Sequence, residues 1–146
     1  MTDKMLNAAD LKYSDIQVGS VYAFKRKIQE QDLMNFANLT GDFNPLHVDK
    51  DFGKRSRFKS NIAHGMLAAS LFSTLVGMYC PGQRSLYLTQ SIKFRRPVFA
   101  GDELLVRGTV INKIDSTRVI VLKTEIIVGA VVVVSGEAQV EIMGDN

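Results

Sequence analysis

The segment from His64 to Tyr79 constrains the fold most, because its pattern predicts a helix that is apolar on nearly every side. Small or hydroxyl residues separate its large apolar side chains, which are Met66, Leu67, Leu71, Phe72, Leu75, Val76 and Met78. A helix without a polar face must be covered by other parts of the protein. Such a helix would be about 24 Å long, the width of a small sheet. We therefore expect a fold built around one buried helix, which Pro81-Gly82 ends.

The second half of the chain supplies strands that could cover this helix. The segments that alternate or are rich in β-branched residues are Ser85–Phe94, Leu104–Ile114, Val119–Val128 and Ala130–Ile142. Turns are expected at Gly101-Asp102, at Asp115-Ser116 and at Gly129. One long helix followed by consecutive strands favours an α+β fold in which a strongly curved antiparallel sheet wraps around the helix.

The first half predicts a short strand at Ser20–Ile28 and a helix at Gln29–Leu39 that ends at Gly41. An irregular, charged stretch follows from Asp42 to Asn61. Long loops inside a small domain are usually functional or mobile. We therefore look for the functional site in this stretch.

Length and composition exclude several classes of protein. The 146 residues suffice for one domain, and a net charge of +3 is too small to indicate a nucleic-acid-binding protein. The single cysteine, Cys80, excludes an internal disulfide and a cysteine metal cluster, and we expect a buried thiol. The first residues, Met1 to Asp15, do not resemble a signal peptide, and no apolar stretch reaches the ~20 residues of a membrane span. A cytoplasmic protein is the simplest expectation.

Asp42 and His47 are the first candidates for chemistry. They flank Asn44-Pro45, where proline fixes its own φ and pushes the preceding residue to an extended shape. A carboxylate held beside an imidazole can orient and deprotonate one water molecule. From the spacing alone, a turn-capping aspartate and an ordinary loop histidine explain the pair equally well.

His64-Gly65 opens the buried helix and suggests a second part of a site. The first N–H groups of a helix have no partners within the helix, and the helix dipole places positive potential there. Gly65 would let another molecule approach, so that its N–H could polarise a thioester carbonyl. Tight packing at Gly65 and simple capping by His64 are the alternative.

The basic cluster of Lys54, Arg55, Arg57 and Lys59 could contact nucleotide phosphates or an acidic carrier protein, although a solvated surface explains it as well. Motifs of other enzyme classes do not occur. The sequence has no phosphate-binding glycine loop, no zinc-ligand spacing and no nucleophile elbow, so no metal site is expected.

Several stretches resemble the (R)-specific enoyl-CoA hydratases, the MaoC-like dehydratase branch of the hotdog-fold superfamily. Residues 36–47 read FANLTGDFNPLH, residues 62–67 read IAHGML, residues 85–88 read SLYL and residues 94–103 read FRRPVFAGDE. The resemblance runs from about Val18 to Ile142 and departs from the family pattern at Gly53, where the family usually has Ala or Ser. It implies a hotdog fold as one domain, residues 18–146, after an N-terminal extension, residues 1–17.

The resemblance also implies roles for individual residues. Asp42 and His47 would hold the catalytic water, and the N–H of Gly65 would bind the thioester carbonyl. The expected supporting residues are Asn44, His64 and Ser73, with Ser73 orienting the catalytic aspartate. The side chains around Thr74 and Val76 would border the acyl tunnel.

The implied reaction is reversible syn hydration of a trans-2-enoyl-CoA to the (R)-3-hydroxyacyl-CoA, as in the supply of precursors for polyhydroxyalkanoate storage. No cofactor is expected, because CoA is part of the substrate, and a homodimer is implied. The same chemistry on acyl-carrier protein, in fatty-acid synthesis, is the alternative that the basic cluster suggests. A thioesterase is a weaker alternative, and a non-catalytic acyl-CoA-binding module is the alternative from a different class.

Overall fold

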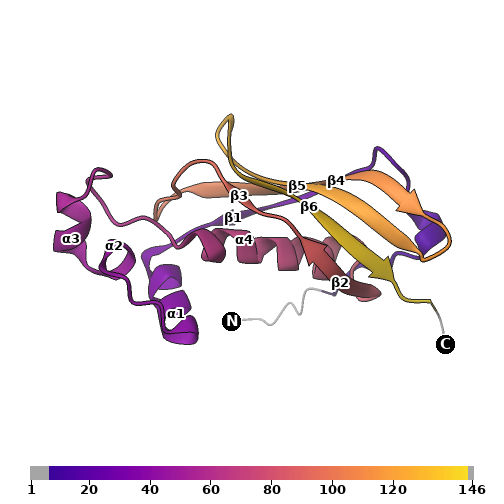
Figure 1. The fold of residues 1–146 in the computed structure, drawn as a ribbon, viewed down its shortest axis with the longest axis horizontal. Helices are drawn as coiled ribbons and strands as arrows, with labels where there is room; N and C mark the ends of the chain where they lie inside the picture. Colours follow the sequence, from indigo (N-terminus) through magenta and orange to yellow (C-terminus); the bar gives the residue numbers. More distant parts are fainter. Residues whose placement is uncertain (1–6, 145–146) are drawn as a thin grey trace.

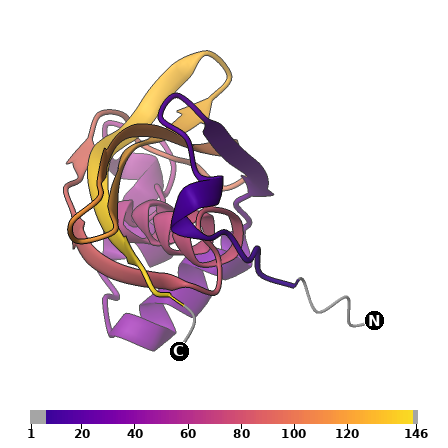
Figure 2. The same cartoon turned by 90° about the vertical axis from the view of Figure 1, so that its right-hand side faces the viewer.

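A central helix lies in the hollow of a curved antiparallel sheet (Figures 1 and 2). The computed structural model describes residues 7–144. Its helical elements are η1 (Tyr13–Asp15), α1 (Glu30–Thr40), α2 (Pro45–Val48), α3 (Lys50–Arg55), α4 (Gly65–Thr74) and the π-helical turn η2 (Leu75–Tyr79). Its strands are β1 (Val21–Lys27), β2 (Ser85–Gln90), β3 (Lys93–Phe94), β4 (Glu103–Ile114), β5 (Val119–Val128) and β6 (Val131–Ile142). The α+β hotdog architecture expected from the sequence is confirmed.

The strands are ordered β1-β4-β5-β6-β2, and β3 also pairs with β6. All these pairings are antiparallel. The hairpins β4–β5 and β5–β6 follow the expected turns, and Gly129 has the positive φ of 60° that the second turn requires. The order leaves β2 at one edge of the sheet, with Leu86 and Leu88 each about half exposed.

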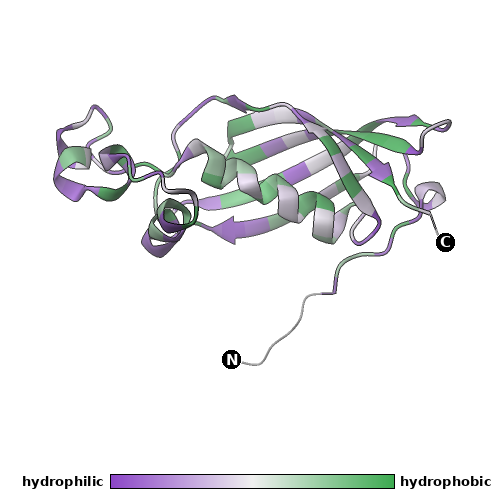
Figure 3. Cartoon of the chain, turned by 60° about the horizontal axis from the view of Figure 1, so that its bottom comes forward, coloured by the Kyte–Doolittle hydropathy of each residue, from purple (hydrophilic) through white to green (hydrophobic). Residues whose placement is uncertain are grey.

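The core lies between α4 and the inner face of the sheet. Figure 3 shows apolar and neutral residues along α4 and apolar bands on the strands behind it. Phe72 and Leu75 pack in one cluster with Leu104, Val106 and Ile126, all of them at most 1% exposed. Burial of a large apolar side chain contributes about 1.5–3 kcal/mol, so this cluster supplies much of the driving force for folding.

The segment before β1 packs against the far end of the helix. Ile16 is 1% exposed and belongs to a second core cluster with Val76 and Cys80, and Asp10 forms a β-bridge with Gly82. The domain boundary between residues 17 and 18 stays a prediction. The first six residues of the N-terminal extension lie outside the described part of the chain.

Two expectations about local structure need correction. The stretch from Asp42 to Asn61 is not irregular throughout, because it contains the short helices α2 and α3. Asn44 and Asp49 cap these helices through their side chains, a signal that the mixed composition concealed. The central helix is also not covered on every side, since Met66 is 56% exposed and Ser70 and Ser73 are exposed on the same stripe. No helix within residues 7–144 is both long and apolar enough to cross a membrane.

Candidate active site

The candidate site lies at the start of α4, where residues 41–64 fold over one end of the sheet. We call these residues the cap segment. It begins at Gly41, which ends α1 in the left-handed conformation with φ 80°. The Asp42 carboxylate accepts a hydrogen bond from the Asn44 N–H at 3.1 Å, and Asn44 in turn caps α2 by accepting from the Leu46 N–H at 3.0 Å. These two bonds determine the turn that connects Asp42 to His47.

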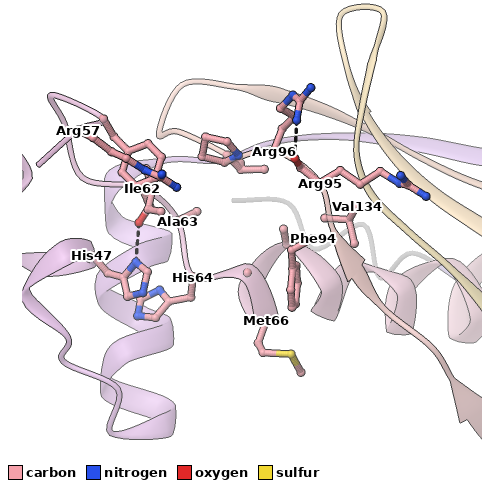
Figure 4. A pocket seen from close by; sticks show the side chains of 15 residues that line it. His47, Arg57, Ile62, Ala63, His64, Met66, Phe94, Arg95, Arg96 and Val134 are labelled. Atoms are coloured by element: carbon pink, nitrogen blue, oxygen red, sulfur yellow. Dashed lines mark hydrogen bonds between the residues drawn. The ribbon is translucent and has the colours of Figure 1, made fainter.

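His47 lies at the end of α2 and points toward the extended segment that precedes α4 (Figure 4). Its Nδ1 is 2.8 Å from the carbonyl oxygen of Ile62. A carbonyl oxygen only accepts, so Nδ1 must carry the proton and donate it. With Nδ1 protonated, the neutral form of the ring has its lone pair on Nε2, and His47 can accept a proton at that nitrogen.

His64 is the third polar group of the site and is only 2% exposed. Its Nε2 lies 3.0 Å from the backbone oxygen of Asp42 and donates to it by the same argument. The Nδ1 atom then carries a lone pair, and it has no hydrogen-bond partner among the described residues. The rings of His47 and His64 stack with their centroids 4.0 Å apart. The ring of Phe36 is tilted relative to that of His64, with the two centroids 4.8 Å apart.

The structure therefore brings Asp42, His47 and His64 together. One ligand-type atom from each of them lies within 4.8 Å of the others. The distances alone would permit a metal ion. The two imidazole rings are stacked, however, with an angle of only 30° between their planes, and lone pairs that lie in two nearly parallel planes do not readily converge on one ion. The geometry suits hydrogen bonds to a water molecule better, and the expectation of no metal stays a prediction.

Gly65 is the first residue of α4 and borders a cavity of about 420 Å³. Figure 4 shows this cavity with His47, His64, Met66 and Phe94 around it. As the first helical residue, Gly65 has an N–H without a partner inside the helix. A Cβ atom at Gly65 would lie 2.8 Å from Cε1 of Phe94, so only glycine fits beside this ring without displacing it. The tight packing at Gly65 is thus confirmed, whereas the role of its N–H stays a prediction.

A second cavity of about 300 Å³ lies on the other side of His47. The basic cluster divides between the two cavities. Arg57 lines the first, Lys54 and Lys59 line the second, and Arg55 lines neither. The first cavity also contains Arg95 and Arg96, which the sequence analysis did not single out. The only signal for them was their place in the resembling stretch FRRPVFAGDE.

Three residues predicted along the central helix, which α4 and η2 form together, lie apart from this group. Ser73 is nine positions after His64, hence about 13 Å farther along the helix, so it does not meet Asp42 within the same chain. Thr74 and Val76 are not among the residues that line the two cavities beside His47. Val76 is 1% exposed and packs in a core cluster with Ile120 and Val140. The length of the helix therefore separates Ser73, Thr74 and Val76 from Asp42 and His47 within one chain, and the roles of these three residues stay predictions.

Comparisons with known proteins agree with the geometry. Residues 15–132 match the family model "MaoC like domain". The chain is 37% identical to an (R)-specific enoyl-CoA hydratase of Rhodospirillum rubrum, covering 88% of this chain and 89% of the relative. It is 39% identical to an (R)-specific enoyl-CoA hydratase of Aeromonas caviae, over 87% and 96% of the two chains. An unliganded (R)-hydratase structure from Pseudomonas aeruginosa superposes with a TM-score of 0.90 at 33% identity, over 94% of this chain and 89% of that chain.

Proposed function

Since the chain belongs to the MaoC-like domain family, we propose that it is an (R)-specific enoyl-CoA hydratase. It adds water reversibly to a trans-2-enoyl-CoA and forms the (R)-3-hydroxyacyl-CoA. One observation carries the proposal beyond the similarity. The Asp42 carboxylate lies within 4.8 Å of a ring nitrogen of His47, and His47 lines a cavity together with Gly65, the first residue of α4.

The Asp42 carboxylate and His47 Nε2 are both acceptors, so one water molecule can donate a hydrogen bond to each of them. Proton transfer to this pair creates a nucleophile for carbon 3 of the enoyl thioester. The proton is then returned to carbon 2 on the same face of the double bond. The geometry singles out neither group for a particular proton, so we assign the step to the pair.

Attack at carbon 3 places negative charge on the thioester oxygen, which becomes an enolate. The N–H of Gly65 and the positive end of α4 would stabilise that charge. The oxyanion donor thus comes from the body of the fold, whereas the water-binding groups come from the cap segment.

The charged residues at the cavities suggest how the carrier binds. Arg57, Arg95 and Arg96 at the first cavity would pair with the phosphates of CoA. The second cavity carries Lys50, Lys54 and Lys59, and these residues motivate the alternative, a dehydratase acting on acyl-carrier protein. Turnover on crotonyl-CoA should be compared with turnover on the same acyl group linked to carrier protein. A strong preference for CoA excludes the alternative.

The decisive test uses the purified protein with crotonyl-CoA and longer trans-2-enoyl-CoAs. We expect loss of the enoyl-thioester absorbance and a 3-hydroxyacyl product of the (R) configuration in chiral analysis. No turnover would refute the proposal, and tight acyl-CoA binding without turnover would favour a binding module instead. Release of free thiol from acyl-CoA would indicate a thioesterase.

A homodimer is part of the proposal. In the single chain the edge strand β2 exposes Leu86 and Leu88, and the outer stripe of α4 exposes Met66 and Ser73. These surfaces would be buried by a second copy, and Ser73 of the partner subunit could then approach Asp42 across the interface. Analytical ultracentrifugation should give a mass twice that of the 16.2 kDa chain. The cytoplasm, a reducing compartment suited to the buried free thiol of Cys80, is the proposed location.

A further inference from the structure

Asn61 makes several hydrogen bonds within the cap segment, although the proposed reaction assigns it no role. Its side-chain amide donates to the carbonyl oxygen of Leu46 at 2.9 Å and to that of Asp49 at 2.8 Å, with a longer contact of 3.4 Å to Pro45. These three carbonyls belong to α2 and its C-cap. A helix of one turn has little stability of its own, so the amide of Asn61 is the principal side-chain support at the end of α2.

The residue after Asn61 holds the His47 ring. The Ile62 carbonyl accepts the Nδ1–H of His47 at 2.8 Å, and the Ile62 N–H makes a longer contact of 3.4 Å with the Leu46 carbonyl. Leu46 therefore contacts both Asn61 and Ile62, while His47 contacts Ile62. The next residue, Ala63, donates its N–H to the carbonyl oxygen of Val98 at 2.7 Å, which connects this segment to the body of the fold.

Gly53 explains why Asn61 can occupy this position. It is buried in α3, and a Cβ atom there would lie 2.6 Å from the backbone N of Asn61 and 2.7 Å from its Nδ2. The nearest atoms are mostly backbone, so they could not move away at low cost. The departure from the family pattern at Gly53 thus coincides with close packing of the asparagine against α3.

We propose that Asn61 is a positioning residue for the hydration reaction, and that Gly53 makes room for it. Asn61 holds α2 against the Ile62 carbonyl, and this carbonyl keeps the proton of His47 on Nδ1. The Nε2 lone pair therefore stays directed toward the water. The inference rests on the proposed function only through the reaction, since the hydrogen bonds and the His47 tautomer can be measured without a substrate.

The kinetic test compares Asn61→Ala and the isosteric Asn61→Asp with wild type. Both variants lose the amide donors, and we expect kcat for crotonyl-CoA to fall about 10- to 100-fold, as small misplacements of catalytic groups do. KM should change less than about threefold, because Asn61 itself would not hold the acyl chain. Asn112→Ala, in the β4–β5 hairpin, is the matched control and should keep wild-type kcat. A kcat within twofold of wild type for both Asn61 variants would overturn the proposal.

The spectroscopic test uses the fact that the chain has only two histidines. In untagged protein labelled with ¹⁵N-histidine, wild-type His47 should show a protonated Nδ1 and an unprotonated Nε2. Both Asn61 variants should shift this ring toward a mixture of tautomers and leave the tautomer of His64 unchanged, because its Nε2 bonds to the Asp42 carbonyl. A reduced kcat with an unaltered His47 signal would also overturn the proposal, because Asn61 would then act by another route. If wild type shows no turnover, the proposed function fails while this test still decides the positioning role.

Gly53→Ala tests the same contact from the other side. The added methyl should displace Asn61 and reproduce both the kinetic and the ¹⁵N changes. Because the two substitutions disturb one contact, the double variant Gly53→Ala/Asn61→Ala should lose no more activity than the more impaired of the two single variants. If the fold-losses of the two single variants multiply in the double variant, the two residues act independently, and the proposed role of Gly53 is overturned.

Discussion

The body of the fold and the cap segment, residues 41–64, are stabilised in different ways. In the body, α4 and the sheet bury large apolar side chains such as Phe72, Leu75 and Ile126, and many neighbours share each contact. In the cap segment most residues are exposed or half-buried, and individual hydrogen bonds made by the side chains of Asn44, Asn61 and His47 determine its shape. The contrast teaches that stability and catalytic geometry depend on separate sets of residues.

If the two regions are separable in this way, substitutions in the cap segment should affect the reaction with little effect on unfolding. Substitutions in the body should do the reverse. Gly65 stands at their junction, because it begins α4 and also borders the cavity.

The largest effect is expected from Asp42→Asn and His47→Gln. Each variant removes one acceptor for the catalytic water, and general acid–base groups contribute about 10²- to 10⁴-fold, so kcat should fall about a thousandfold. The midpoint of thermal unfolding should stay nearly constant, since Asp42 is exposed and His47 is half-buried. Enoyl-thioester absorbance and thermal denaturation measure the two quantities. Activity above a tenth of wild type in either variant would remove that residue from the proposed pair.

Leu75→Ala should show the opposite pattern. Leu75 is fully buried and packs against the sheet at Gly108, so truncation should lower the free energy of unfolding by about 2–5 kcal/mol. The folded enzyme should keep its kcat. Leu39→Ala is the matched control, because Leu39 is 83% exposed and the change should be within about 0.5 kcal/mol. Equal destabilisation by both substitutions in urea titrations would contradict the division between body and surface.

Gly65→Ala probes the junction. The new methyl would clash with the Phe94 ring and narrow the approach to the N–H, so we expect kcat/KM to fall about tenfold, equivalent to about 1.4 kcal/mol. Gly77→Ala is the control in the same continuous helical segment, since a Cβ there meets no described atom within 4 Å beyond its chain neighbours and the backbone of its own helix. Adding Phe94→Ala to Gly65→Ala should recover part of the loss. No recovery would show that the methyl blocks the substrate itself and not the ring.

The smallest effect concerns Cys80 in the body. Burial raises the pKa of its thiol from 9.0 to about 12, so the folded protein holds this proton more tightly than the unfolded chain. The corresponding stability is present below pH 9 and is lost as the pH rises from 9 toward 12. Stability measured across that range should fall less steeply in Cys80→Ala than in wild type. At pH 8 the native thiol should not react with a thiol reagent until the protein unfolds, and rapid reaction would refute its burial.

Much of the fold could be predicted because its signals are local. The predicted segment 119–128 coincides with β5, and the predicted helix 29–39 differs from α1 by one residue at each end. In the site, the Gly-Asp-x-Asn-Pro-x-His motif predicted that Asp42 and His47 lie close together, because a short capped turn joins them. Alternating and apolar patterns indicate which face of a segment is buried, and this information lies within the segment itself.

The remaining parts of the site depend on contacts between distant positions. Arg57 and Arg95 share a cavity although 38 positions separate them, and Asn61 bonds to Leu46 and Asp49 across two short helices whose polar sequence concealed them. The sequence by itself determined the central helix, the consecutive strands and the Asp42–His47 turn, because those signals lie within a few residues. Only the tertiary structure decided which cations face the cavity, which nitrogen of His47 is free and why Gly53 carries no side chain. Each of these depends on atoms that approach only after the sheet has closed around the helix.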